Sequence, residues 1–204
     1  MTDFTKNRNN GLRKHLRKHA RVARYVIYKE TLIDFKDHFW TFIGSFVGIA
    51  LIGLINKGSF SNTDTIFLIG SFGASSVLIY GIVNSPLAQP RNLVGGHVIC
   101  ALVGVTVHYI IPDEIWLSSA FAVSLSIVMM QITKTLHPPG GATALIANIG
   151  SEKVTSLGYL YVLSPVLTGV LILLLVALII NNMTSHRSYP KNKNWYKIWK
   201  RKYR

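Results

Sequence analysis

The chain has 204 residues, of which 50% are hydrophobic and only 15% are charged, and its formal net charge is +14. About a quarter of the residues in soluble domains are charged, so this composition argues against an ordinary soluble domain. The single cysteine, Cys100, excludes a disulfide framework. The polar, basic stretch through Lys36 is too long to begin a cleavable signal peptide.

Basic residues are concentrated at the two ends of the chain. Residues 1–38 contain ten of the 22 Lys and Arg residues and residues 182–204 contain eight, whereas the part between them has four basic and four acidic side chains. This distribution predicts a basic cytoplasmic segment over 1–38, a transmembrane domain over 39–181 and a basic cytoplasmic tail over 182–204. Anionic lipid headgroups are the expected partners of both ends, and nucleic acid is not, because the body is neutral and apolar.

Part of the N-terminal segment has the pattern of an amphipathic helix. Within residues 11–30, apolar side chains recur at steps of three and four, and Lys and Arg occupy the other positions. This pattern predicts a basic helix that lies on the inner leaflet. A disordered basic tail is the alternative.

Six apolar segments follow, over residues 39–55, 66–83, 93–111, 115–132, 136–149 and 159–180. About 20 residues cross a bilayer as a helix, so the sixth segment is long enough and the first, third and fourth nearly so. The second segment is interrupted by glycines, and the fifth is short and broken. We therefore expect an all-α membrane protein, a polytopic helical bundle with four to six spans.

The two interrupted segments resemble each other. Gly73-Ala74-Ser75-Ser76 matches Gly141-Ala142-Thr143-Ala144, 68 residues further on. The chain then divides into halves over 39–111 and 115–181, a 3+3 repeat with broken or re-entrant second and fifth segments. Interrupted segments at matching positions of two halves indicate a transporter binding site.

The number of crossings is weighed by the charges of the loops. With six crossings, Arg91 and Lys134 lie on the inside and the acidic turn at Asp113 and Glu114 lies outside. With four crossings and two re-entrant segments, Arg91 and Lys134 move outside. The positive-inside rule favours six, and three crossings per half make the repeat inverted.

The stretch His137-Pro138-Pro139-Gly140-Gly141 breaks the fifth segment. Its prolines lack N–H donors, and its glycines permit a close approach of other groups. Non-helical backbone at membrane depth must be buried in protein or line a wet cavity. We expect a helix to follow over 142–149, whose N-terminal N–H groups suit an anion. A turn at the membrane surface is the alternative.

Three stretches together resemble a known family. They are Gly70-Ser71-Phe72-Gly73-Ala74-Ser75, then Ser85 to Asn92 leading to Gly95-Gly96-His97, and the stretch from His137 to Thr143. In this order and spacing they resemble the HPP family of integral membrane proteins, over roughly residues 35–182. The resemblance implies transport, with nitrite the substrate proposed for plant and cyanobacterial relatives. That family is usually described with four spanning helices.

Several side chains in and near these stretches suit an anion or a proton. Arg91 offers paired guanidinium donors to a planar oxyanion, unless it lies at the lipid headgroups. His97 and His137 are candidates for proton coupling, with a structural hydrogen-bonding role as the alternative. Hydroxyls and backbone N–H groups complete the expected substrate site, although hydroxyls often bond to their own helix. These residues are Gly73, Ser75, Ser76, Gly140, Gly141 and Thr143.

No enzyme motif is present: the chain lacks HExxH, CxxC and P-loop patterns, so we expect no enzyme, no metal site and no cofactor. The sequence predicts a transporter or channel for a small inorganic anion such as nitrite, in a bacterial inner membrane. The alternative is a non-transporting scaffold whose basic tails bind anionic lipid or a cytoplasmic partner. A homo-oligomer is compatible with both.

Overall fold

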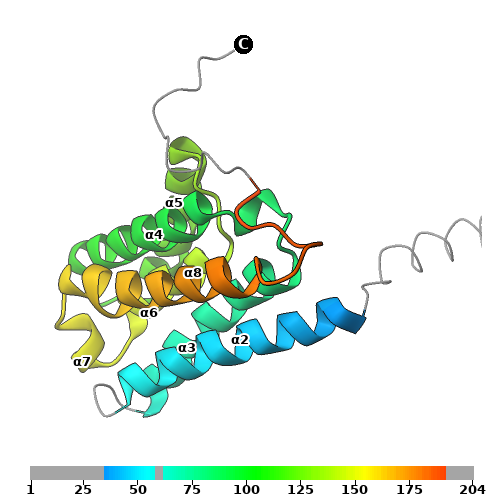
Figure 1. Cartoon of the computed structure of the whole chain (residues 1–204). Helices are drawn as coiled ribbons and strands as arrows, with labels where there is room; N and C mark the ends of the chain where they lie inside the picture. The colour runs from blue at the N-terminus through cyan, green and yellow to red at the C-terminus, as the bar shows by residue number, and fades with distance from the viewer. Residues whose placement is uncertain (1–34, 58–61, 192–204) are drawn as a thin grey trace, which may run out of the picture. The chain divides into compact units, whose positions relative to one another are not determined.

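The structure is a computed structural model, which describes residues 35–57 and 62–191. The chain divides between His38 and Phe39 into two units, and the following concerns the second. The predicted amphipathic helix over 11–30 and the last residues of the basic tail lie outside the described residues. The described residues form helices and no strands, which confirms the expected all-α class (Figure 1).

The helices follow the predicted segments closely. They are α2 (Phe35–Asn56), α3 (Asn62–Ser76) with the π-helical turn Val77–Gly81, a 3-10 turn Pro86–Ala88, α4 (Pro90–Ile110), α5 (Ile115–Thr133), α6 (Pro139–Ile149), α7 (Glu152–Thr155), and the π-helical turn Val162–Leu167 leading into α8 (Thr168–Ile180). Four helical stretches among the described residues are long and apolar enough to cross a membrane: α2, α4, α5 and residues 162–180. The chain is therefore a multi-pass membrane protein.

One end of the bundle carries Arg91, and we call it the Arg91 end. Arg91 begins α4 and donates a hydrogen bond from Nη2 to the carbonyl of Thr133, the last residue of α5, at 2.8 Å. Two further bonds bring α2, the end of the second segment and the end of α8 to a common level: Thr41 Oγ1 to the Tyr80 carbonyl at 2.9 Å, and Asn181 Nδ2 to the Ile79 carbonyl at 2.8 Å. Tyr189 joins this level to the start of α4, because its hydroxyl donates to the Ala88 carbonyl.

The opposite end carries Asp64, and we call it the Asp64 end. The Asp64 carboxylate accepts hydrogen bonds from the backbone N–H and the hydroxyl of Ser151, just after α6, at 3.2 and 2.6 Å. Three other pairs lie toward this end: His108 with the Asn148 carbonyl, Asn148 with Ser118, and Thr106 with Tyr159. The end of α4, the start of α5, the end of α6 and the approach to α8 therefore share one level.

These contacts show that residues 35–57 and 62–191, which the structure describes, pass along the bundle six times. Helices α2 and α4 and the fifth segment run from the Arg91 end to the Asp64 end, and α3, α5 and α8 run back. The fifth passage is composite, because the non-helical residues 134–138 cover its first part and the eleven-residue α6 covers the rest. Four long helices and six passages are thus compatible. The two halves of the chain run in opposite directions, as an inverted repeat requires.

The repeat also predicts which residues face each other at its axis. Ser71 on α3 and Pro139 at the start of α6 are 68 positions apart, which is the spacing of the repeat. The Ser71 hydroxyl lies 3.2 Å from the Pro139 carbonyl oxygen. Because α3 and α6 run antiparallel, this contact brings equivalent positions of the predicted repeat together where the two helices cross.

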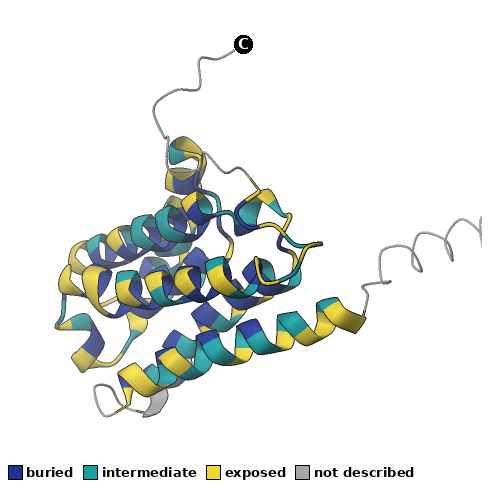
Figure 2. Ribbon diagram, viewed as in Figure 1, coloured by how far each residue is buried: buried dark blue, intermediate teal, exposed yellow. Residues whose placement is uncertain are grey.

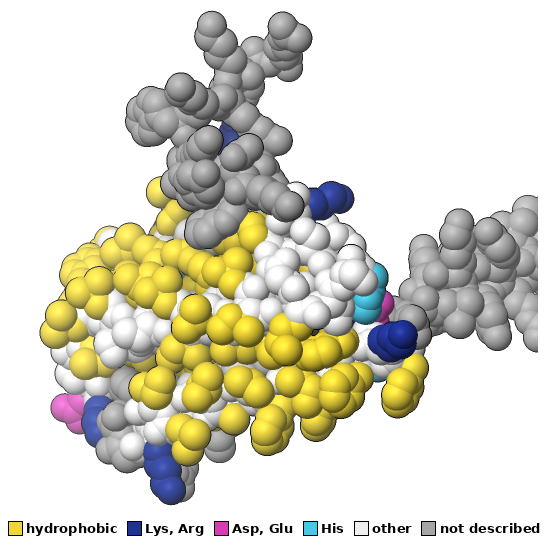
Figure 3. Space-filling view, in the orientation of Figure 1, with side chains coloured by type: hydrophobic (Ala, Val, Ile, Leu, Met, Phe, Trp, Pro, Cys, Tyr) yellow, Lys and Arg dark blue, Asp and Glu magenta, His cyan; other side chains and the backbone are white. Residues whose placement is uncertain are grey.

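The apolar core lies between the helices, and large apolar side chains also cover the outside. Figure 2 shows the buried face of each helix turned toward its neighbours. Tyr80 fills the space beside α2, where Gly48 is close enough that a Cβ would lie 2.7 Å from the Tyr80 hydroxyl. Outward-facing aromatic and aliphatic residues on α2 and α8 form an apolar surface (Figure 3). Such an extensive exposed apolar surface suits contact with lipid.

The packed part of the chain continues past the boundary that the sequence predicted at residue 181. Tyr189 is only 2% exposed, and its hydroxyl donates to the Ala88 carbonyl at 2.8 Å. Burial raises the pKa of the Tyr189 phenol, so the side chain stays a neutral donor. Arg187 donates to the Thr41 hydroxyl at 3.0 Å. Arg187 and Tyr189 thus contact the bundle, so the first part of the predicted tail over 182–204 packs against the transmembrane domain.

Candidate functional site

A buried polar cluster lies where α3, α4 and α6 meet. Ser75, His97 and His137 are 0% exposed, and Ser71 and Thr143 are also buried. Helix α3 supplies both serines, α4 supplies His97, and the broken fifth passage supplies His137 and Thr143. Polar groups buried in an apolar bundle cost free energy unless they form hydrogen bonds, so we expect these five side chains to bond to one another or to the backbone.

Ser75 joins the two imidazoles. Its hydroxyl lies 2.7 Å from His97 Nε2 and 3.0 Å from His137 Nε2. The two rings are close, with centroids 5.0 Å apart. One hydroxyl therefore connects two titratable side chains that are 40 residues apart in the sequence.

The cluster extends from each imidazole to a backbone carbonyl. On one side, His137 Nδ1 lies 2.8 Å from the Leu87 carbonyl oxygen. A carbonyl only accepts hydrogen bonds, so Nδ1 of His137 is assigned as a proton donor. On the other side, His97 Nδ1 lies 2.7 Å from Thr143 Oγ1, which lies 2.7 Å from Ser71 Oγ. Ser71 then reaches the Pro139 carbonyl.

Glycines on α4 let the fifth passage come this close. A Cβ on Gly96 would lie 2.5 Å from His137 Cβ and 3.0 Å from the Thr135 carbonyl oxygen. Asn92, one turn earlier, donates to the Leu136 carbonyl at 2.8 Å. The Gly-Gly-His order on α4 therefore has a direct physical reason. Gly96 leaves room for the segment that carries His137, and the next residue, His97, places its ring beside that of His137.

The predicted glycines of the fifth passage have different surroundings. A Cβ on Gly140 would lie 2.8 Å from Cys100 Sγ, so this glycine allows α6 to pack on α4. A Cβ on Gly141 would meet no atom within 4 Å. The Gly140 and Gly141 N–H groups donate to the His137 and Pro138 carbonyls at 2.9 and 3.1 Å. Helix α6 thus begins at Pro139 and not at residue 142 as expected, and the N–H groups of Gly140 and Gly141 are already bonded within the chain.

Arg91 lies outside the cluster. Its side chain is exposed, and its bond to the Thr133 carbonyl caps the C-terminal end of α5. The partial negative charge of a helix C-terminus attracts such a cation. Arg91 therefore lies at the C-terminal end of α5 and not beside the imidazoles of His97 and His137.

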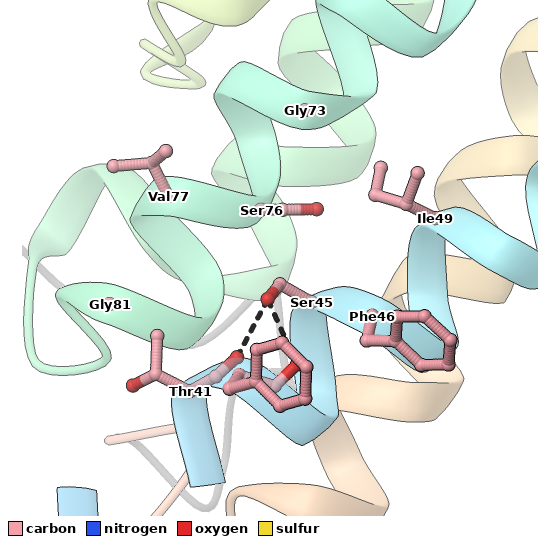
Figure 4. A pocket seen from close by; sticks show the side chains of 9 residues that line it. Thr41, Ser45, Phe46, Ile49, Gly73, Ser76, Val77 and Gly81 are labelled. Carbon is pink, nitrogen blue, oxygen red and sulfur yellow. Dashed lines mark hydrogen bonds between the residues drawn. The ribbon is translucent and has the colours of Figure 1, made fainter. Parts of the chain in front are cut away.

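Gly73 and Ser76 line a separate groove between α2 and the second segment (Figure 4). The groove has a volume of about 450 Å³ and is mostly apolar. The Ser76 hydroxyl donates to the Phe72 carbonyl at 3.0 Å, which is the bonding to its own helix that was the alternative for this residue. The other lining residues are Thr41, Phe42, Ser45, Phe46, Ile49, Val77 and Gly81.

The sequence predicted four of the five side chains in the cluster and missed Ser71. The signal that identifies Ser71 is its position, one helical turn before Ser75 and one repeat before Pro139. Among the described residues no group of three or more His, Cys, Asp or Glu side chains forms a candidate metal site. The imidazoles of the cluster can exchange protons, and its hydroxyls and ring N–H groups can donate hydrogen bonds to a ligand.

Four long apolar helices and a buried polar cluster between α3, α4 and α6 define an all-α polytopic membrane protein. The sequence profile described as "HPP, transmembrane region" matches residues 30–190. The chain belongs to this family, as its motifs indicated.

Two transmembrane proteins of Dictyostelium discoideum are similar to the chain. Each is 45% identical over 160 residues, which cover 77% of this chain and 56% or 51% of the relative. The chain thus spans about half the length of these curated relatives. No solved structure matches it.

Proposed function

We propose that this protein transports a small inorganic anion, with nitrite as the leading candidate, across a membrane. The observation that carries this proposal is the crossing of α3 and α6 at equivalent positions of an inverted repeat, with His97 and His137 buried beside it. Transporters with inverted repeats bind their substrates at such crossings of interrupted segments, near the middle of the bilayer. We assign the protein no enzymatic activity.

The chemistry of the cluster favours an anion over a metal cation. Its hydroxyls and imidazoles can each donate a hydrogen bond, and no carboxylate takes part in the bonds between the five clustered side chains. A cation at this depth needs an acidic partner, whereas an anion needs donors and positive charge. Arg91 at one mouth of the bundle supplies positive charge that attracts anions to that end.

The orientation follows from the charges. We propose that the Arg91 end, where Thr41 on α2 and Asn181 after α8 lie, faces the cytoplasm, because the chain ends are basic and the opposite turn contains Asp113 and Glu114. A bacterial inner membrane stays a prediction, since the two relatives belong to Dictyostelium discoideum and the basic ends require only a membrane with an anionic inner face.

Reconstitution tests the proposal against the scaffold alternative. The full chain is placed in liposomes, and the initial uptake of nitrite, nitrate and chloride is compared with that of protein-free liposomes. We expect uptake of at least one anion, and its loss in His137→Gln. Monodisperse, correctly inserted protein that moves none of the three anions would instead support a scaffold.

A further inference from the structure

We propose that the buried cluster binds one proton together with the anion, so that the protein is an electroneutral proton–anion symporter. This inference rests on the proposed transport function and adds the coupling ion. It is argued from the five side chains His137, Ser75, His97, Thr143 and Ser71, which we call the imidazole–hydroxyl chain.

The imidazole–hydroxyl chain consists of six donor–acceptor pairs in series between two carbonyl groups. In order they are Leu87 O with His137 Nδ1 at 2.8 Å, His137 Nε2 with Ser75 Oγ at 3.0 Å, Ser75 Oγ with His97 Nε2 at 2.7 Å, His97 Nδ1 with Thr143 Oγ1 at 2.7 Å, Thr143 Oγ1 with Ser71 Oγ at 2.7 Å, and Ser71 Oγ with Pro139 O at 3.2 Å. Every pair in this series needs one proton between its two heavy atoms. Outside the series, the Ser75 hydroxyl also lies 3.2 Å from the Ser71 carbonyl oxygen of its own helix, which can only accept.

The neutral side chains supply one proton too few. Each of the three hydroxyls and each neutral imidazole carries a single mobile proton, which gives five protons for six pairs. Two lone pairs that face each other without a proton repel, so the gap falls at the longest pair, between Ser71 and Pro139. His137 then donates from Nδ1 and accepts at Nε2, whereas His97 donates from Nε2 and accepts at Nδ1.

One added proton completes the series. It converts His97 or His137 to an imidazolium, and the hydroxyls turn so that Ser71 donates to the Pro139 carbonyl. Ser75 lets the positive charge pass between the two rings by proton transfer along existing hydrogen bonds. Only N–H and O–H bonds form or break: the proton comes from water on one side of the membrane and returns to water on the other.

The added charge couples the proton to the anion. A single charge buried in an apolar bundle is costly, and so is an anion without a cationic partner. When both are present each compensates the other, so that the proton raises the affinity for the anion and the anion raises the affinity for the proton by the same factor. A neutral pair then crosses, and no net charge moves.

The groups that surround the imidazole–hydroxyl chain are not expected to bind the added proton in place of the two histidines. From the segment before α8, the Tyr161 hydroxyl donates to the Thr143 carbonyl at 3.2 Å. From α3, the Phe72 ring lies 5.5 Å from the His97 ring. Cys100 on α4 is a buried thiol beside Gly140. The charged residues Asp64 and Arg91 bond at the two ends of the bundle.

The first test observes the imidazoles directly. The ¹⁵N shifts of histidine in the full chain, reconstituted in lipid and held at high pH, report the tautomers. We expect the Nδ1–H form of His137 and the Nε2–H form of His97. On acidification in the presence of nitrite, both rings should respond together, and Ser75→Ala should separate their responses. Opposite tautomers, or rings that respond independently in the wild type, would overturn the inference whether or not transport is found.

The second test measures the coupling in liposomes that contain a pH-sensitive dye. An inward gradient of one pH unit should accumulate nitrite about tenfold, with a matching entry of protons above that of protein-free liposomes. A potential set by valinomycin and potassium should not change the rate. Ser75→Ala should lose proton entry, and Ser75→Thr, which keeps the hydroxyl, should retain it. Uptake that follows the potential would show uncoupled anion movement and overturn the symport, while the absence of all uptake would instead overturn the transport function.

Discussion

Replacement of Ser75 by alanine tests whether the imidazole–hydroxyl chain stabilises the fold as the bond geometry implies. The change removes the only hydroxyl that lies within 3.0 Å of both His97 Nε2 and His137 Nε2. An unsatisfied buried polar group costs about 1–3 kcal/mol, which would give about 2–6 kcal/mol for two ring nitrogens. Hydrogen bonds between membrane helices average only about 0.6 kcal/mol, because unfolded segments find other partners. We therefore expect Ser75→Ala to lower the free energy of unfolding by about 1–3 kcal/mol.

The adjacent serine provides a matched control. Ser76 is also buried on the second segment, but its hydroxyl bonds only to the Phe72 carbonyl of its own helix. Such bonds add little to helix stability, so Ser76→Ala should change the free energy of unfolding by less than about 0.5 kcal/mol. Unfolding of both variants in mixed micelles, followed by circular dichroism, gives the comparison. Equal losses for the two alanine variants would refute the assignment of Ser75 as the link between the imidazoles.

Three further experiments test other parts of the structure. Gly96→Ala should destabilise the bundle by about 1–3 kcal/mol, because its Cβ would press on His137, and Gly141→Ala should be tolerated, because its Cβ has open space; thermal unfolding in detergent compares them. Tyr189→Ala should cost roughly 3 kcal/mol if residues 182–191 belong to the packed bundle, and an unchanged melting temperature would restore the earlier boundary. Cysteine introduced at Asp113 in a Cys100→Ser background should react with an impermeant maleimide from the side opposite the termini; labelling only after permeabilisation would contradict the proposed orientation.

Local patterns were sufficient to predict the helices and four of the five side chains in the imidazole–hydroxyl chain. Hydropathy and the charged ends predicted the segments, and the repeat paired Ser75 with Thr143, both of which lie in the imidazole–hydroxyl chain. His97 and His137 stood out because ionisable residues are costly in an apolar segment. These features depend on residues close together in sequence or on a repeat that is visible in the sequence itself.

The features that the sequence did not predict depend on contacts between residues that are far apart in the chain. Arg91 looked like an anion ligand, but it meets the end of α5, 42 residues away. Gly140 and Gly141 are equivalent in sequence terms, yet only Gly140 packs against Cys100. Tyr189 lies beyond the last apolar segment and is buried through Ala88, 101 residues earlier. Such long-range pairings leave no local periodicity from which they could be predicted.

The most direct test of the transport site compares two histidines of α4. His97 lies in the imidazole–hydroxyl chain, whereas His108 lies toward the Asp64 end, next to the Asn148 carbonyl. The initial rate of nitrite uptake is measured for liposomes with equal amounts of folded, inserted wild type, His97→Gln and His108→Gln. We predict that His97→Gln abolishes uptake above the protein-free rate and that His108→Gln keeps the wild-type rate. Equal rates for both variants, or loss confined to His108→Gln, would contradict a transport site at the crossing of α3 and α6.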